Sequence, residues 1–175
     1  PFDDWLAGAE QQHLAADSML IHAGERSRHL YFLHSGLLRL YYTTPDGKER
    51  NKAFYGPGHL LGAVSAAMTG SVASFSIQAL ETSLLVRTDF ESLYRQAHRH
   101  PELSRAMIDL LAGAFIRNEQ REAMLLTLSA EQRYQWLLDK EPELVKRLPQ
   151  FHIASYIGVD AVSLSRLKRK LKLGQ

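Results

Sequence analysis

The spacing of the apolar residues changes near residue 88, and this change constrains the fold more than any other feature of the sequence. Before it, short apolar segments alternate with turn residues, and six of them are predicted as strands: 18–22, 30–34, 37–43, 49–54, 74–80 and 83–87. The segment 44–47 (Thr-Pro-Asp-Gly) predicts a hairpin turn, because proline presets φ and glycine accepts a positive φ. Many short strands at this spacing indicate a β-sandwich, barrel or jelly roll.

Beyond residue 88 the pattern is helical. Thr88 with Glu91, and Ser129 with Gln132, fit the capping box, so helices should begin near 89 and 130. A long helix is expected from Pro101 to about residue 128. Along it, positions spaced alternately by four and three form an a/d seam that two arginines interrupt: Leu103, Met107, Leu110, Ala114, Arg117, Arg121, Met124 and Leu128. Such a seam can pair with a second copy or pack on its own chain, and its length favours a helix that pairs two copies.

Charge is distributed unevenly along the chain. From Val145 onward there are seven basic residues and one acidic residue, Asp160, which gives +6; the preceding 144 residues carry 14 basic and 18 acidic residues, or −4. This asymmetry suggests a polyanionic partner for the C-terminal segment. A solvated basic helix end is the alternative, since cations there also favour the helix dipole.

The segment 148–172 has the pattern of a helix-turn-helix. Pro149 precedes a short helix with an apolar face, Gly158 supplies the turn, and Asp160 is suited to cap the next helix. Two short helices joined by a turn of three to four residues that contains glycine are typical of DNA-reading motifs. An ordinary helical hairpin with a basic outer face is the alternative.

The second helix carries the residues predicted to contact double-stranded DNA. Arg166 is the candidate for a base-edge contact, because a guanidinium can bond guanine O6 and N7 together. Ser163 and Ser165 are candidates for bases or phosphates. Lys168, Arg169 and Lys170 are expected to serve phosphates, which fix the register of a protein on the duplex.

Several functional classes are disfavoured by composition. The chain has no cysteine, which excludes disulfides, thiolate metal sites and cysteine nucleophiles. No apolar run approaches the roughly 20 residues that span a bilayer, and no signal-peptide pattern is present, so we expect a cytoplasmic protein without a membrane partner. No Ser/His/Asp spacing, P-loop or dinucleotide motif is found, so we expect no enzyme and no cofactor.

The eight histidines raise one competing class, a cupin-like metal-binding β-barrel enzyme. Such a site needs a His-x-His on a strand, with a third histidine and a carboxylate nearby. The single His-x-His, His98 to His100, lies in a helical region before Pro101. We therefore expect no metal site. A sensor or scaffold that does not bind DNA is a third reading.

Four segments carry a resemblance to known proteins: "HAGERSRHLYFLHSGLLRLYY", "PDGKERNKAFYGPGHLLG", "SFSIQALETSLLV" and, most specifically, "IASYIGVDAVSLSRLKRKL". Through them the chain, over nearly its whole length, resembles the cAMP-receptor/FNR (Crp/Fnr) family of bacterial transcription regulators. It implies an α+β fold with a cyclic-nucleotide-binding-type β-roll (jelly roll) in 1–100, a dimerisation helix in 101–128 and a helix-turn-helix domain in 129–175. It also implies a homodimer, palindromic promoter DNA and RNA polymerase as a further partner. Because the sequence stops at Gln175, we expect no β-wing within it.

The chain departs from this family at the effector pocket. Members that bind cyclic nucleotide carry Gly-Glu and Arg-Ser in a phosphate cassette. Here the cassette begins with Gly62, Ala63 and Val64 and ends with Ala73 and Ser74, so both charged ligand groups are absent. We therefore expect a degenerate effector pocket that does not take cAMP, and the effector stays unidentified.

The recognition helix and the cofactor pattern also depart from the family. Ala161 and Val162 stand where better-known members place charged base-contacting residues, whereas Arg166 matches a base-contacting arginine. The implied operator should therefore differ, with apolar contacts such as those to thymine methyl groups replacing hydrogen bonds. Because the sequence contains no cysteine, an iron–sulfur cluster with cysteine ligands is excluded. A histidine or methionine that ligates haem is left open.

Overall fold

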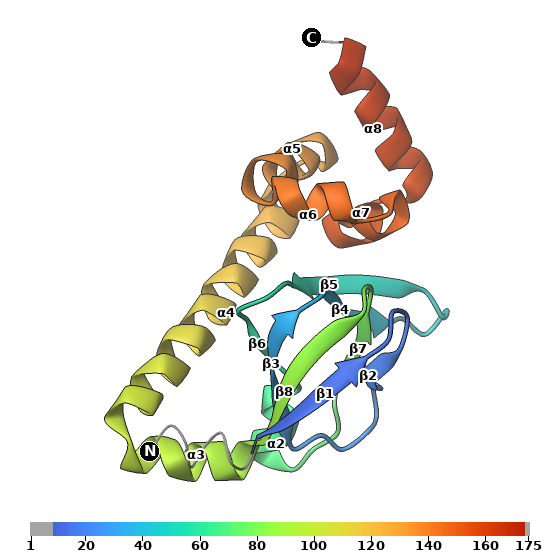
Figure 1. Cartoon of the computed structure of the whole chain (residues 1–175). Coiled ribbons are helices and arrows are strands. Elements are labelled where there is room, and N and C mark those ends of the chain that lie inside the picture. The colour runs from blue at the N-terminus through green and yellow to red at the C-terminus, as the bar shows by residue number, and fades with distance from the viewer. Residues whose placement is uncertain (1–8, 174–175) are drawn as a thin grey trace.

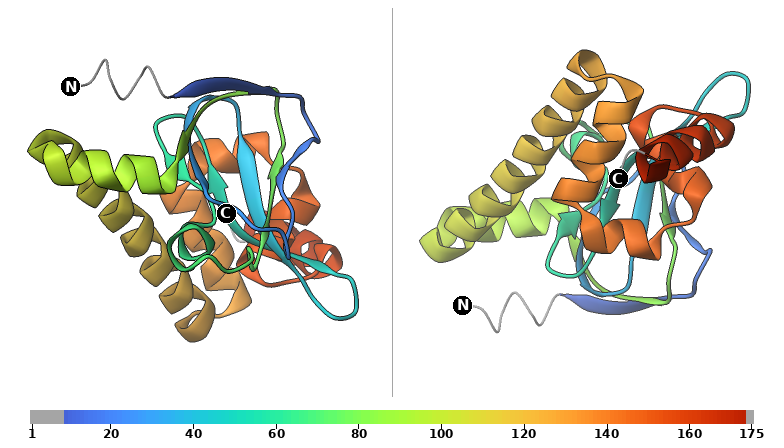
Figure 2. Two further views of the ribbon diagram at one scale, coloured as in Figure 1. Left: turned by 90° about the horizontal axis from the view of Figure 1, so that it is seen from below. Right: turned by 90° about the horizontal axis from the view of Figure 1, so that it is seen from above.

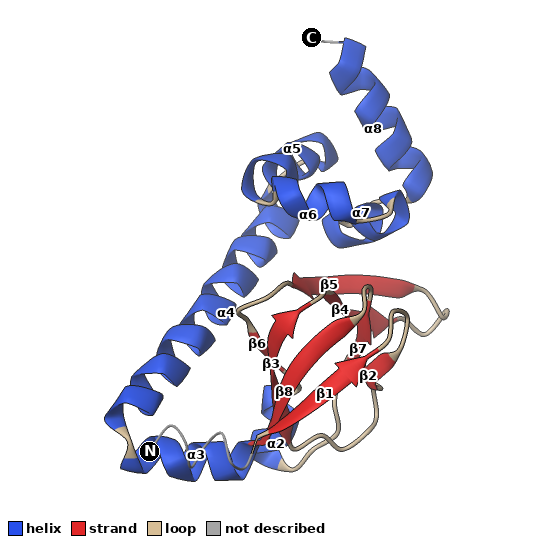
Figure 3. Ribbon diagram, viewed as in Figure 1, coloured by secondary structure: helices blue, strands red, loops and turns tan. Residues whose placement is uncertain are grey.

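The computed structural model describes residues 9–173, and its strands form two four-stranded antiparallel sheets (Figure 3). The first sheet has the order β1 (Glu10–Leu14), β8 (Ser83–Asp89), β3 (His29–Ser35) and β6 (Leu60–Leu61). The second has the order β2 (Met19–Ile21), β7 (Ser76–Ala79), β4 (Leu38–Thr43) and β5 (Glu49–Tyr55). The predicted β-roll is confirmed.

The roll is held together by apolar side chains between the sheets. Leu33 and Leu85 from one sheet and Leu38 and Ile77 from the other are each 0% exposed. Each such side chain stabilises the fold by about 1.5–3 kcal/mol relative to an exposed position. The predicted hairpin turn is also confirmed, since Gly47 has φ 79° and its amide donates to the Thr44 carbonyl at 2.8 Å.

Seven helices complete the part of the chain that the structure describes: α2 (Val64–Thr69), α3 (Phe90–Arg99), α4 (Pro101–Thr127), α5 (Ala130–Lys140), α6 (Pro142–Arg147), α7 (Gln150–Ile157) and α8 (Ala161–Leu173). Helix α4 rises past the roll from α3 to the unit formed by α5–α8, which we call the C-terminal unit (Figure 1). No helix among residues 9–173 is both long and apolar enough to cross a membrane.

The predicted helix starts are found with one change of cap. At α5 both bonds of the predicted capping box form, between Ser129 and Gln132. At α3 the cap is Asp89 rather than Thr88, and its carboxylate accepts the Ser92 amide at 3.0 Å. Thr88 instead lies in β8 and is 6% exposed, so the strand runs one residue further than the capping box predicted.

The a/d seam predicted on α4 packs on its own chain. Met107 joins a small core with Leu30 and Leu93, and Met124 is 2% exposed. Arg121 donates to the backbone carbonyl of Asn51 in β5 at 2.6 Å. This was the alternative reading of the seam, and it leaves another face of α4 for any pairing of two copies.

The C-terminal unit lies over the end of the roll, as the view from above shows (Figure 2). Leu37 of the roll, with the half-buried Phe54 and Leu80, packs in the same apolar cluster as Ile153 of α7 and Leu164 of α8. The helix-turn-helix is therefore positioned by a core that it shares with the roll.

Candidate nucleic-acid interface

The turn between α7 and α8 requires glycine. Gly158 has φ 75° and ψ 33°, a left-handed conformation that ends α7. A Cβ at this position would lie 3.2 Å from Nη1 of Arg133, so a side chain would also be crowded. The amide of Val159 then donates to the Ala154 carbonyl at 3.0 Å, which satisfies a free carbonyl at the helix end. The predicted helix-turn-helix is confirmed in its geometry.

Asp160 starts α8 as the sequence predicts. Its Oδ1 accepts the amide of Ser163 at 2.7 Å, and its Oδ2 accepts the Ser163 hydroxyl at 2.9 Å. These bonds favour the charged carboxylate and lower the pKa of Asp160. Ser163 is half-buried and engaged in this cap, so its hydroxyl is already used within the protein.

The buried side of α8 fixes which residues face outward. Leu164 is 0% exposed, and Leu167 and Leu171 are half-buried. With about 100° between successive residues, the opposite side carries four exposed residues: Val162, Ser165, Arg166 and Arg169. We call these four the outer face of α8. The C-terminal end of α8 projects away from the roll (Figure 1).

The other predicted DNA contacts lie on the flanks of α8. The ammonium of Lys168 donates to Oε1 of Gln150 in α7 at 2.9 Å. The ammonium of Lys170 pairs with Glu131 of α5 at 2.6 Å, on the opposite flank. Thus, of the six predicted residues, the structure gathers Ser165, Arg166 and Arg169 on one face, and it engages the other three in bonds within the protein.

A shallow groove runs between the start of α7 and α8, and sequence reasoning singled out only part of it. Gln150 and Ala161 line it together with Ser165, Lys168 and Arg169. Gln150 follows Pro149 at the first position of α7, and its Oε1 accepts the ammonium of Lys168. The helix boundary itself was thus the signal that could have identified Gln150.

The segment predicted as an effector pocket is filled by small side chains. Ala63 and Ala73 are 1% and 2% exposed and belong to the core of the roll, whereas Ser74 is exposed and Val64 packs toward α3. Gly62 has φ 147°, and a Cβ there would lie 2.9 Å from the His29 carbonyl. No residue of 62–74 is charged, so this segment supplies no cation for a cyclic phosphate and does not fit cAMP.

An exposed apolar stripe on α4 was not predicted. Ile108, Phe115 and Leu126 are 62%, 63% and 76% exposed, and with Ala112 they lie along one side of the helix, about 100° around its axis from Met107. These four residues are the apolar stripe of α4. The signal in the sequence was that α4 carries apolar residues on two sides, one of which the chain itself cannot cover.

The histidines do not assemble a cupin-type site in the described part of the chain. His98 lies on α3 against the ring of Tyr94, with 4.5 Å between ring centroids. Among residues 9–173, no group of three or more His, Cys, Asp or Glu side chains is placed to hold a metal ion.

Comparison with known proteins agrees with this fold. The cyclic nucleotide-binding domain family matches residues 11–100. The fumarate and nitrate reduction regulatory protein of Escherichia coli (strain K12) is 28% identical over 159 residues, which cover 85% of this chain and 63% of that protein. The regulatory protein HlyX of Actinobacillus pleuropneumoniae is 26% identical over 160 residues, which cover 85% of this chain and 66% of that protein. The chain thus spans less than two thirds of these curated relatives.

Solved structures show the same fold at low sequence identity. The c-di-GMP-responsive global regulator CLP of Xanthomonas campestris has a TM-score of 0.81 at 17% identity, over 99% of this chain and 91% of that chain. FixK2 from Bradyrhizobium japonicum has a TM-score of 0.79 at 20% identity, over 95% of this chain and 85% of that chain.

The matched residues 11–100 are just over half of the 175-residue chain, and the chain belongs to the cyclic nucleotide-binding domain family. The curated relatives are named as regulatory proteins, which agrees with the Crp/Fnr resemblance that the sequence indicated. The curated relatives are named as regulatory proteins rather than enzymes, which agrees with the prediction that this chain is not an enzyme.

Proposed function

We propose that this chain is a sequence-specific DNA-binding transcription regulator that reads the major groove with α8. The outer face of α8 supports this most directly: two exposed arginines and a serine stand on a helix that a glycine turn and a buried leucine hold in place. Arg166 reads a base, while Arg169 and Lys168 contact phosphates on either side. Lys170 reaches a phosphate only by exchanging its pair with Glu131, and Ser163 supports the cap.

The protein acts as a homodimer in this proposal, and α4 pairs the two copies through the apolar stripe. Three large apolar side chains more than half exposed on one side of a helix are a face that water disfavours. Two-fold pairing along α4 would present two α8 helices to a palindromic site. The same proposal divides the chain into a roll (1–100), a dimerisation helix (101–128) and a DNA-binding domain (129–175), of which residues 1–8 and 174–175 lie outside the described residues. It also includes a cytoplasmic location and RNA polymerase as a partner.

Titration of DNA tests the proposal. A duplex pool selected from random sequence by the protein is titrated by fluorescence anisotropy at several salt concentrations. The logarithm of the affinity should fall linearly with that of salt, with a slope of about −0.9 per phosphate contacted. Arg169→Ala should reduce the slope by about 1, and Arg166→Ala should cost about 1–3 kcal/mol and relax preference at one half-site position.

Lys146→Ala is the matched control. Lys146 is exposed on α6 and paired with Glu143, away from α8, so its removal should leave both slope and preference unchanged. If the wild-type protein binds no duplex at low salt, the regulator proposal fails and the sensor or scaffold reading replaces it.

A further inference from the structure

The roll, α4 and the C-terminal unit come together at one place. A cavity of about 150 Å³ opens there between β5, α4, α5, α6 and α7. One buried water needs roughly 10–15 Å³ of such space, so the cavity has room for more than one water. None of its lining residues belongs to the segment 62–74, so it is separate from the cassette that the family uses for a cyclic phosphate.

The cavity is lined by four cationic side chains: Lys52, Arg117, Arg121 and Lys140. Glu141 is the acidic residue among its lining residues. In the described part of the chain none of the four cations forms an ion pair with a carboxylate. Cations gathered around a cavity without such pairs form an environment that attracts an anion.

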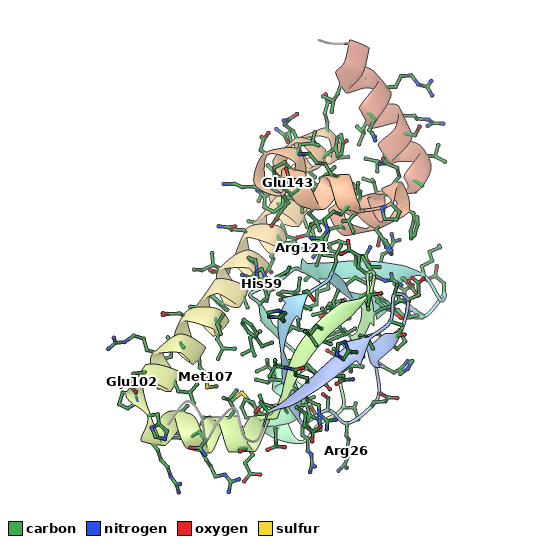
Figure 4. All side chains as sticks on the ribbon, in the orientation of Figure 1. Arg26, His59, Glu102, Met107, Arg121 and Glu143 are labelled. Atoms are coloured by element: carbon green, nitrogen blue, oxygen red, sulfur yellow. The ribbon has the colours of Figure 1, made fainter. Side chains whose placement is uncertain are left out.

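Arg121, which Figure 4 labels, lines this cavity from α4. Its Nη2 donates to the carbonyls of Asn51 at 2.6 Å and Tyr156 at 3.1 Å, and its guanidinium lies 4.8 Å from the Tyr156 ring centroid. Its Nε is buried and has no hydrogen-bond partner among residues 9–173. A buried donor without a partner costs about 1–3 kcal/mol. The carbonyl bonds explain the position of Arg121, but they leave this donor unused.

The charged forms of Lys52 and Arg121 are both disfavoured at this cavity. Burial, and then the charge of Arg121, lowers the pKa of Lys52. Burial also lowers the pKa of Arg121. An anion bound between these groups would favour their charged forms and relieve both penalties.

We propose that this cavity binds a small oxyanion, a phosphate or a carboxylate, with Arg121 and Arg117 as its principal ligands. Tyr55 and Tyr156 add aromatic walls, and the guanidinium of Arg117 already lies 5.4 Å from the Tyr55 ring centroid. Because the lining comes from the roll, α4 and the C-terminal unit together, the bound anion holds the C-terminal unit against the roll. The site stands independently of DNA binding.

Trp136 lines the cavity and reports on its occupancy. The chain has a second tryptophan, Trp5, so the experiment uses the full chain carrying Trp5→Phe. Inorganic phosphate and benzoate are titrated separately at constant ionic strength, with sodium chloride as the reference anion. We expect a saturable change in fluorescence and a higher Tm with at least one of the two probes, and neither with chloride. A response to phosphate alone or to benzoate alone identifies which oxyanion the site takes.

Arg117→Gln and Arg121→Gln should each weaken binding about tenfold, the size of one lost charge-assisted hydrogen bond. Arg117→Gln is the safer variant, because Arg121→Gln also removes two bonds to backbone carbonyls. Arg105→Gln, at an exposed arginine on α4 that is absent from the cavity lining, is the control and should bind as the wild type does. If neither probe binds, or if Arg117→Gln binds as tightly as Arg105→Gln, the site does not exist.

Discussion

The side-chain amide of Asn51 joins β5 to α7. Its Nδ2 donates to the His152 carbonyl and lies 3.1 Å from His152 Nδ1, while its Oδ1 accepts Nη1 of Arg39 at 3.3 Å. A carbonyl oxygen can only accept, so the amide orientation is determined. The Nδ1 of His152 must then also accept, which makes His152 a neutral imidazole protonated at Nε2.

His152 should therefore make the stability of the protein depend on pH. Burial and then the nearby charge of Arg39 lower the pKa of His152 from 6.5 to about 4, against the opposing effect of Glu49. The unfolded chain then binds more protons than the folded one between these values, so the free energy of unfolding should fall as pH falls from 6.5 to about 4. Urea denaturation at steps across this window measures the slope.

His152→Asn should flatten this slope and lower stability at pH 7, because an amide cannot titrate but fits the site less well. His34→Asn, at an exposed histidine of β3, is the control and should keep the wild-type slope. Equal slopes in the wild type and in His152→Asn would show that the pH dependence has another source.

Residue roles were predictable where their partners are near in sequence. Gly158 and Asp160 act on groups within a few residues, so local rules sufficed to identify them. Arg121 and Asn51 were not identified as a pair, because 70 residues separate them. Arg121 was even assigned to a helix-pairing seam, since its spacing is the same whichever partner covers it.

At the scale of elements, the strength of the local sequence pattern determined which strands and helices could be predicted. The six predicted strands all occur, with ends shifted by a few residues. Strand β1 was missed because its sequence, Glu-Gln-Gln-His-Leu, is polar, and β6 because it has two residues. Helix α2 has six residues and no side-chain cap, so the sequence offered no start signal.

Helix α4 gives the element-scale prediction. Phe115→Glu should dissociate the proposed dimer, because each copy would place a charge in the paired apolar stripe. The dissociation constant should rise on the order of 100-fold or more, since a buried charge without a partner is costly. Sedimentation velocity over a concentration series measures the change.

Ala106→Glu introduces the same side chain at an exposed position of α4 away from the stripe. It should leave the dissociation constant unchanged. A wild-type protein that is monomeric at all concentrations would refute the pairing through α4. A dimer that survives Phe115→Glu would assign it to a different surface.

At the scale of the whole molecule, the roll and the C-terminal unit share an apolar core that the sequence did not reveal. The sequence predicts Leu37, Phe54 and Leu80 as strand residues of the roll, but they pack against the helix-turn-helix. Around them, Arg147 of α6 pairs with Glu81 at 2.6 Å, and Ser155 of α7 accepts the Asn51 amide at 2.9 Å. Strand periodicity shows which side chains are apolar but not which of two cores they enter.

This shared core predicts that weakening it lets the C-terminal unit open separately from the roll. The Phe54 ring lies 5.2 Å from that of Tyr156 and 6.2 Å from that of His152, centroid to centroid, so Phe54→Ala should weaken the contact by about 2 kcal/mol. Hydrogen exchange with mass spectrometry should then show faster exchange of α7 amides, while β3 amides keep their protection. Phe75→Ala is the control, because Phe75 packs against Tyr42 within the roll, at 6.1 Å between centroids. If Phe54→Ala accelerates exchange equally in α7 and β3, the contact does not govern a separate opening of the C-terminal unit.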